Sequence, residues 1–242
     1  MKLSFFAVIT LSMISFKDSQ LQHARVKEAY RSKEETVKSL FKTKHLQQDG
    51  FNLFIRAFKK EGKLEAWIKE KHNTNYTLLT TYDFCTTSGT AGPKRKEGDL
   101  QIPEGIYHIN HFNPQSNFYL SLGINYPNAS DKILSDRQKP GGEIYIHGNC
   151  VTIGCIPITD DKIKELYILA VEARNNGQEK IPVHIFPCRM DDSGMKSLEG
   201  HFAKPDLISF WNNLKDIYLD FEQTHLINPM TIDKTGRYVL TR

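Results

Sequence analysis

The residues best suited to chemistry lie between Tyr145 and Asp160, in the stretch YIHGNCVTIGCIPITD. Within it His147 and Cys155 are eight positions apart, and each has a glycine as its neighbour. A cysteine attacks a carbonyl carbon as the thiolate, and a free thiol, with a pKa of about 8.5, needs a nearby imidazole or helix N-terminus to lower that pKa. The pair therefore predicts nucleophilic catalysis, with Cys155 as the attacking thiolate and His147 as its base.

The glycines beside this pair, Gly148 and Gly154, predict a close approach of the backbone to a ligand. Amide N–H groups that converge on one point can stabilise the oxyanion of a tetrahedral intermediate. We expect the donors to be the backbone amides of Ile153, Gly154 and Cys155.

The same stretch resembles the active-site signature of the L,D-transpeptidase catalytic-domain (YkuD-like) family. In that family a His-Gly pair on one strand precedes Ser/Thr-x-Gly-Cys, whose cysteine is the nucleophile. The matching positions here are His147-Gly148 and Thr152-Ile153-Gly154-Cys155. Upstream, Gly98-Asp99 and residues 102–107 are similar to the Pro-x-Gly strand that opens the family's domain.

Three features set this chain apart from the commoner family pattern. Ile153 stands where a second His is usual, the separation between His147 and Cys155 is short, and the residues after Cys155 are apolar. The chain is therefore similar to a divergent subgroup, which includes enzymes that cut links between peptidoglycan and an attached lipoprotein.

The resemblance implies a two-step acyl transfer on peptidoglycan stem peptides. Cys155 would attack the carbonyl of the third stem residue to form a thioester, which an amine or water then resolves, while His147 moves the proton in both steps. A lipoprotein linked to murein is left open as a further partner, and no cofactor or metal is expected. The residues implied in oxyanion and substrate contacts are Gly148, Thr152, Ile153 and Gly154.

Other interpretations of the same residues stay open. Cys155 could be a buried inert thiol, and His147 a structural histidine, in a catalytically inactive module that binds cell wall. A cysteine peptidase of ordinary proteins would share only the local motif. Of these possibilities, the acyl-transfer enzyme accounts best for a His and a Cys that both have glycine neighbours.

The four cysteines allow several pairings. If Cys155 is the nucleophile, at most one bridge forms among Cys85, Cys150 and Cys188. A metal cluster of His147, Cys150 and Cys155 is chemically allowed, but the segment lacks the C-x-x-C pairs of structural zinc sites. The sequence therefore leaves the state of Cys150 open.

The N-terminal residues are typical of an export signal. A lysine at position 2 precedes an uncharged run from Leu3 to Phe16, and a polar stretch follows. The run is too short for a membrane span of about 20 residues. We interpret residues 1–18 as a signal peptide without an A-x-A cleavage site, and expect export to the periplasm or cell envelope with no stable membrane span after removal. A retained anchor or a first buried helix of a cytosolic protein is the alternative.

Composition argues against a nucleic-acid partner. The formal charge of +4 comes from 32 basic and 28 acidic residues, which are spread along the 242-residue chain. A mildly basic surface suits solubility and is compatible with an anionic polymer.

The elements that would position the pair predict an α+β fold with a mixed β-sheet core. Residues 19–84 are assigned to an N-terminal helix and a small antiparallel β-meander, 85–190 to an L,D-transpeptidase-like catalytic domain, and 191–242 to a C-terminal helical extension. Within the catalytic domain we expect no helix from 113 to 142, a strand ending at His147, and a helix capped by Thr159. A packed helix should begin after Pro205, with Trp211 in the core.

Overall fold

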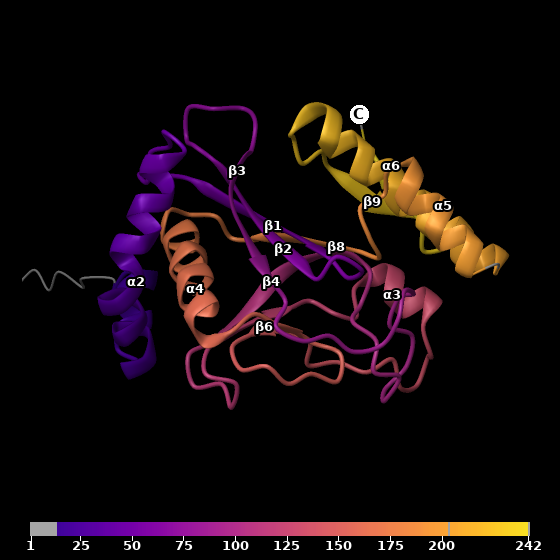
Figure 1. Ribbon diagram of the computed structural model, residues 1–242, viewed down its shortest axis with the longest axis horizontal. Coiled ribbons are helices and arrows are strands. Elements are labelled where there is room, and N and C mark those ends of the chain that lie inside the picture. The colour runs from indigo at the N-terminus through magenta and orange to yellow at the C-terminus, as the bar shows by residue number, and fades with distance from the viewer. Residues whose placement is uncertain (1–13, 203, 242) are drawn as a thin grey trace, which may run out of the picture.

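The computed structural model describes residues 14–202 and 204–241 and has the predicted α+β architecture, with helices on both sides of a curled mixed sheet (Figure 1). The helices are α1 (Phe16–Gln20), α2 (Ala24–Thr43), α3 (Ala129–Leu134), α4 (Asp160–Asn175), α5 (Asp192–His201) and α6 (Pro205–Thr224). The strands are β1 (Asn52–Phe58), β2 (Lys63–Lys69), β3 (Thr77–Asp83), β4 (Gly105–Asn113), β5 (Ser121–Ile124), β6 (Tyr145–His147), β7 (Ile156–Pro157), β8 (Pro182–Phe186), β9 (Met230–Ile232) and β10 (Tyr238–Leu240).

One eight-stranded sheet runs through most of the chain, in the order β3-β2-β1-β8-β4-β5-β6-β7. The first three strands form the predicted antiparallel meander. However, β1 also pairs in parallel with β8, where Ile55 lies opposite Val183. The meander, which the sequence placed before residue 85, therefore shares its sheet with β4 to β8.

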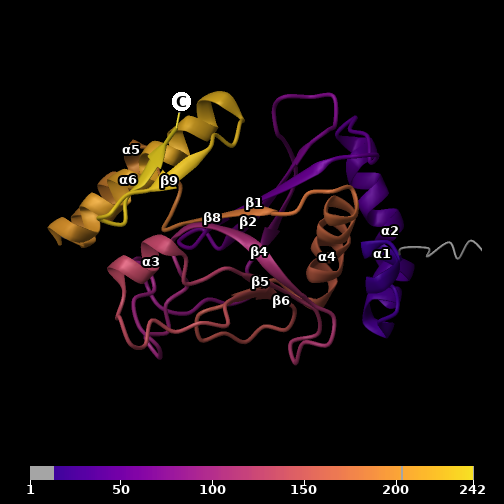
Figure 2. The same ribbon diagram turned by 180° about the vertical axis from the view of Figure 1, so that it is seen from behind.

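Both faces of this sheet are covered by helices, α2 and α4 on one side and α5 and α6 on the other (Figures 1 and 2). Along β1, Leu53 and Ile55 join the core under α2 and α4, while Phe54 and Phe58 join cores formed with α6. Alternate side chains of a strand point to opposite faces, so a strand covered on both sides is apolar on both.

The prediction of no helix between residues 113 and 142 was wrong, because α3 occupies six residues there. A capping box starts it: the Asn128 side chain accepts the Asp131 N–H at 2.9 Å, and the Asp131 carboxylate accepts the Asn128 N–H at 3.1 Å. Such a short helix has no periodic pattern, but the Asn-x-x-Asp spacing is a usable start signal.

At the N-terminal end, where the sequence predicted one helix after residue 18, the structure has two helices, α1 and α2, separated by residues 21–23. Residues 1–13 of the predicted signal peptide lie outside the described residues. Its last residues belong to α1, where the Phe16 ring contacts Phe112 at 5.0 Å and Lys17 Nζ lies 2.6 Å from Glu172 Oε1 of α4. In the described part of the chain, no helix combines the length and apolar character needed to cross a membrane.

The C-terminal region contains more structure than the sequence predicted. Helix α6 begins at Pro205 as expected, and Trp211 is fully buried. The region also contains α5 and the β9–β10 hairpin, which were not predicted. The Trp211 indole donates to Glu104 Oε2 at 2.8 Å, and Glu104 Oε1 accepts the Gly92 N–H at 2.7 Å. These bonds tie α6 to the loop over residues 88–104.

Candidate active site

The relative positions of the candidate base and nucleophile follow from the pairing of β6 with β7. These strands are parallel, with Ile146 opposite Ile156 and His147 opposite Pro157. Cys155 therefore lies beside Tyr145, and the alternation of side chains places both on the same face as His147. The step from His147 to Cys155 is two residues along, about 7 Å, and one strand across, about 5 Å.

The His147 imidazole is almost completely buried, at 1% exposure, under the ring of Phe118, whose centroid is 4.7 Å away. Its Nδ1 forms a hydrogen bond with the Gly148 carbonyl. A carbonyl only accepts, so Nδ1 carries the proton and Nε2 is left as a proton acceptor. Burial lowers the pKa of His147 below 6.5, and the bond to Gly148 opposes this only in part. At neutral pH the imidazole is uncharged and able to act as a base.

The Cys155 thiol is free and partly buried, and its Sγ donates to the carbonyl of Glu143 at 3.6 Å. Burial raises the pKa of Cys155 above 9.0, although the backbone of Tyr145 and the charge of Lys94 act in the opposite direction. The resting pair is therefore a neutral thiol and a neutral imidazole, and the proton has to move during attack.

Thr152 holds the turn that leads into Cys155. Its Oγ1 accepts the N–H groups of Gly154 at 3.1 Å and Cys155 at 2.8 Å, and donates to the Cys155 carbonyl at 2.8 Å. Two of the amides expected in an oxyanion hole are thus bonded to the Thr152 hydroxyl in this structure. Gly154 has φ of +141°, and a Cβ there would lie 3.1 Å from the Gln101 carbonyl oxygen, so both conformation and space favour glycine. The third expected donor is the backbone N–H of Ile153, a residue that is 78% exposed.

Gly148 is required by packing against the start of α4. A Cβ at this position would lie 2.5 Å from Asp160 Oδ1 and 3.0 Å from the Phe118 carbonyl oxygen. The same Asp160 oxygen accepts the Asn149 N–H at 2.7 Å. The predicted Thr159 cap is present, since Thr159 Oγ1 accepts the Lys162 N–H. The groups that approach Gly148 closely are therefore Asp160 and Phe118 of the protein itself, whereas the sequence predicted a ligand there.

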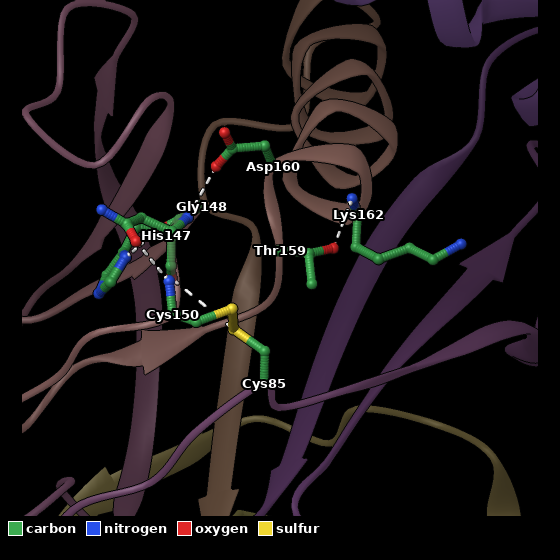
Figure 3. Close-up of a disulfide and its surroundings, with 8 residues drawn as sticks. Cys85, His147, Gly148, Cys150, Thr159, Asp160 and Lys162 are labelled. Atoms are coloured by element: carbon green, nitrogen blue, oxygen red, sulfur yellow. Dashed lines mark hydrogen bonds between the residues drawn. A yellow bond between two sulfur atoms is a disulfide. The ribbon is translucent and has the colours of Figure 1, made fainter.

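A disulfide joins Cys85 to Cys150 in the loop between His147 and Cys155 (Figure 3). The two Cα atoms are 5.5 Å apart, and the Cys85 N–H also donates to the Pro157 carbonyl at 3.0 Å. The bond settles the pairing that the sequence left open, and it takes Cys150 out of the metal cluster considered with His147 and Cys155. Cys188 is free and buried.

Two charged residues near the thiol were not selected from the sequence. Lys94, 5% exposed, lies in the loop over residues 88–104 and donates to Asp99 Oδ1 at 2.7 Å. Glu143 lies on the segment before β6, has φ of +55°, and places its carbonyl against Sγ of Cys155. The sequence signals were a Lys-Arg-Lys cluster and a Gly-Gly pair, but neither indicates which side chain reaches a thiol so far along the chain.

Residues 55–185 match the YkuD family, the L,D-transpeptidase catalytic domain. This range is more than half of the chain and contains both His147 and Cys155. The chain belongs to the L,D-transpeptidase catalytic domain family. Membership in this family supports a function in peptidoglycan modification.

Known proteins similar to this L,D-transpeptidase family member include "Putative L,D-transpeptidase YafK" of Escherichia coli (strain K12). The two are 36% identical over 196 residues, which are 80% of this chain and 75% of YafK. Among solved structures, the helical cell shape determining protein Pgp2 of Campylobacter jejuni is 18% identical, with a TM-score of 0.46 over 76% of this chain and 74% of that one. Against a mutant of Pgp2 the sequence identity is 20% and the TM-score is 0.45, and the match covers 70% of this chain and 60% of that one.

Proposed function

We propose that this protein is a peptidoglycan peptide acyl-transfer enzyme with a thioester intermediate, in which Cys155 is the nucleophile and His147 the general base and acid. The observation that carries the proposal is the parallel register of β6 and β7, which puts the thiol and the imidazole on one face of the sheet. The tautomer set by the Gly148 carbonyl, with Nε2 unprotonated, supports the role of His147 as base.

The reaction would run in two steps. As Sγ of Cys155 forms a bond to the carbonyl carbon of a stem peptide, its proton passes to Nε2 of His147. The C–N bond then breaks, the imidazolium protonates the departing amine, and a thioester remains. An amine or water then attacks the thioester carbon and gives its proton to His147, the C–S bond breaks, and the imidazolium returns the proton to Sγ, so the acceptor decides between transpeptidation and hydrolysis.

A disaccharide-tetrapeptide assay tests this proposal. Mass spectrometry of the intact protein should detect an acyl group on Cys155, and the product masses should report whether an amine or water was added. Cys155→Ser should abolish both signals, whereas the matched variant Cys188→Ala, at the other free thiol, should retain them. Product formation by Cys155→Ser would overturn the assignment.

The other candidate functions predict different results in the same preparation. An inactive module would bind murein sacculi without acylation or product. A general cysteine peptidase would cleave casein and leave murein unchanged. A murein-linked lipoprotein as substrate would be recognised by release of the protein from sacculi.

Export to the periplasm or cell envelope is part of the proposal, because peptidoglycan lies there. The contacts of Phe16 and Lys17 with the folded body favour a leader shorter than the residues 1–18 interpreted as the signal peptide, with cleavage before Phe16. N-terminal sequencing of the protein recovered from the cell envelope checks this, and a mature chain that starts after Lys17 would contradict it.

A further inference from the structure

A groove of about 330 Å³ lies between β4, β5 and the segment that enters β6, and two residues of its lining, Glu143 and Tyr145, adjoin Cys155 through their backbones. Its lining includes Asn110, His111, Glu143 and Tyr145. Gly123 lies beneath it: a Cβ there would lie 2.9 Å from the Tyr145 ring and 3.0 Å from His111 Cβ. The absence of a side chain at Gly123 therefore leaves room for the groups that line the groove.

Glu143 links this groove to the thiol. Its backbone carbonyl is 3.6 Å from Sγ of Cys155, while its side chain lines the groove and accepts the Tyr145 hydroxyl at 2.8 Å on Oε2. Burial, together with this bond, raises the pKa of Tyr145 to about 12, so the phenol remains a neutral donor. A ligand held by the Glu143 carboxylate would thus lie next to the acyl group that Cys155 attacks.

The backbone of Glu143 is held in a conformation that it would not adopt freely. With φ of +55° it lies in the left-handed region, which costs a residue other than glycine of order 1 kcal/mol or more. The preceding segment is fixed from both sides: the Tyr126 hydroxyl donates to the Pro140 carbonyl at 2.9 Å, and the Glu97 N–H donates to the Lys139 carbonyl at 2.8 Å. The surrounding contacts therefore fix where Glu143 sits relative to the thiol.

We propose that Glu143 is a specificity-determining residue, whose carboxylate in the groove beside Cys155 binds a primary ammonium group of the substrate peptide. A carboxylate offers about four lone-pair sites, and Tyr145 uses one of them. Oε1 is left to a ligand, and a compact ammonium needs only a single oxygen, whereas a guanidinium is bound best by both. The inference rests on the proposed function for Cys155 as the reacting atom.

Charged alkylating reagents test the groove without any need for turnover. The rates of Cys155 modification by 2-bromoethylamine (cationic), iodoacetamide (neutral) and iodoacetate (anionic) are measured by peptide mass spectrometry in the full chain. Relative to iodoacetamide, Glu143→Gln should slow the cation and speed the anion, each by about threefold at low salt, and high salt should reduce both effects. Normalising to the neutral reagent removes any change in the thiol pKa.

Two variants separate recognition from structure. Glu179→Gln removes an exposed carboxylate that does not line the groove and should leave all three ratios unchanged. Tyr145→Phe removes the hydroxyl and keeps the Glu143 charge, so it should retain the preference for the cation. Equal rate changes for all three reagents in Glu143→Gln, or loss of the preference in Tyr145→Phe alone, would overturn the proposal.

Matched tetrapeptides then test specificity during turnover. One peptide carries lysine as its third residue, and the other carries norleucine, which lacks the ammonium group. The wild type should prefer the lysine peptide in kcat/KM, and Glu143→Gln should reduce that preference by about threefold to tenfold, mainly through KM. If the wild type turns over neither peptide, the proposed function fails, while the reagent series still decides the role of Glu143. Equal loss on both peptides would count against ammonium recognition.

Discussion

The thiol of Cys155 and the imidazole of His147 are both neutral at physiological pH, and this determines how the site can work. Burial moves their pKa values in opposite directions, down from 6.5 for His147 and up from 9.0 for Cys155. A preformed thiolate–imidazolium pair needs the reverse order of pKa values. The structure therefore favours proton transfer that accompanies attack, a form of general base catalysis.

The expected pH dependence of catalysis and of thiol alkylation follows from the directions of these two pKa shifts. Protonation of His147 removes the base, so kcat/KM should fall only when the pH drops below 6.5. Alkylation of Cys155 by iodoacetamide, which requires the thiolate, should still increase above pH 9.0. Stopped assays at a series of pH values measure both kcat/KM and the rate of alkylation. A thiol that reacts at full rate at pH 7, as a low-pKa thiolate would, contradicts the neutral pair.

At the scale of elements, three short segments each supply one residue of the candidate site. Strand β6 supplies His147, the turn held by Thr152 supplies Cys155, and the loop over residues 88–104 supplies Lys94. The Cys85–Cys150 disulfide joins the end of β3 to the loop between base and nucleophile. It lies beside the site and takes no part in the proposed chemistry.

Removal of this disulfide should affect stability more than catalysis. The bond spans 65 residues, and closing a loop of this length stabilises the folded state by about 4 kcal/mol in the chain-entropy description. The Cys85→Ser, Cys150→Ser double variant should lose that free energy of unfolding in urea titrations. Where it is folded, it should keep most of its activity. Abolished activity in a variant that is still folded would move Cys150 into the catalytic machinery.

At the scale of the whole molecule, a buried cation attaches α6 to the sheet. Arg56 of β1, 2% exposed, donates to Glu65 Oε2 at 2.8 Å and to Glu222 Oε1 of α6 at 2.6 Å. Its guanidinium also lies over the rings of Trp67 and Phe221. Burial alone would raise the pKa of Glu65, but the charge of Arg56 and the bonds from its neighbours hold it below 4.5.

Arg56→Met should destabilise the protein by about 3–5 kcal/mol, because it leaves the buried Glu65 without its main partner. Urea unfolding measures the change, and Arg31→Met, at an exposed arginine of α2, is the matched control with an expected change within about 0.5 kcal/mol. Since the pKa of Glu65 is lowered by folding, its contribution to wild-type stability is complete above pH 4.5 and is lost as the pH falls through the lowered value. Similar stability of Arg56→Met and the control would rule out this role.

Residue types and short-range spacing determined much of the molecule. The Thr159 cap of α4 and the amphipathic helix after Pro205 are local patterns, and the structure contains both at the expected place. They were predictable because caps and helical faces depend on neighbours three or four positions away. The antiparallel meander was equally local, although its pattern did not reveal that helices cover both faces of the sheet.

Only the tertiary structure decided which distant residues meet. The parallel register of β6 with β7, the partner of Cys150, and the positions of Lys94 and Glu143 against the thiol all depend on contacts between separate segments. Strand pairing and loop packing are selected by the energy of the whole core, which no short window of sequence contains. The sequence thus proposed Cys155 and His147 as the reacting residues, whereas the fold determines their surroundings and the directions of their pKa shifts.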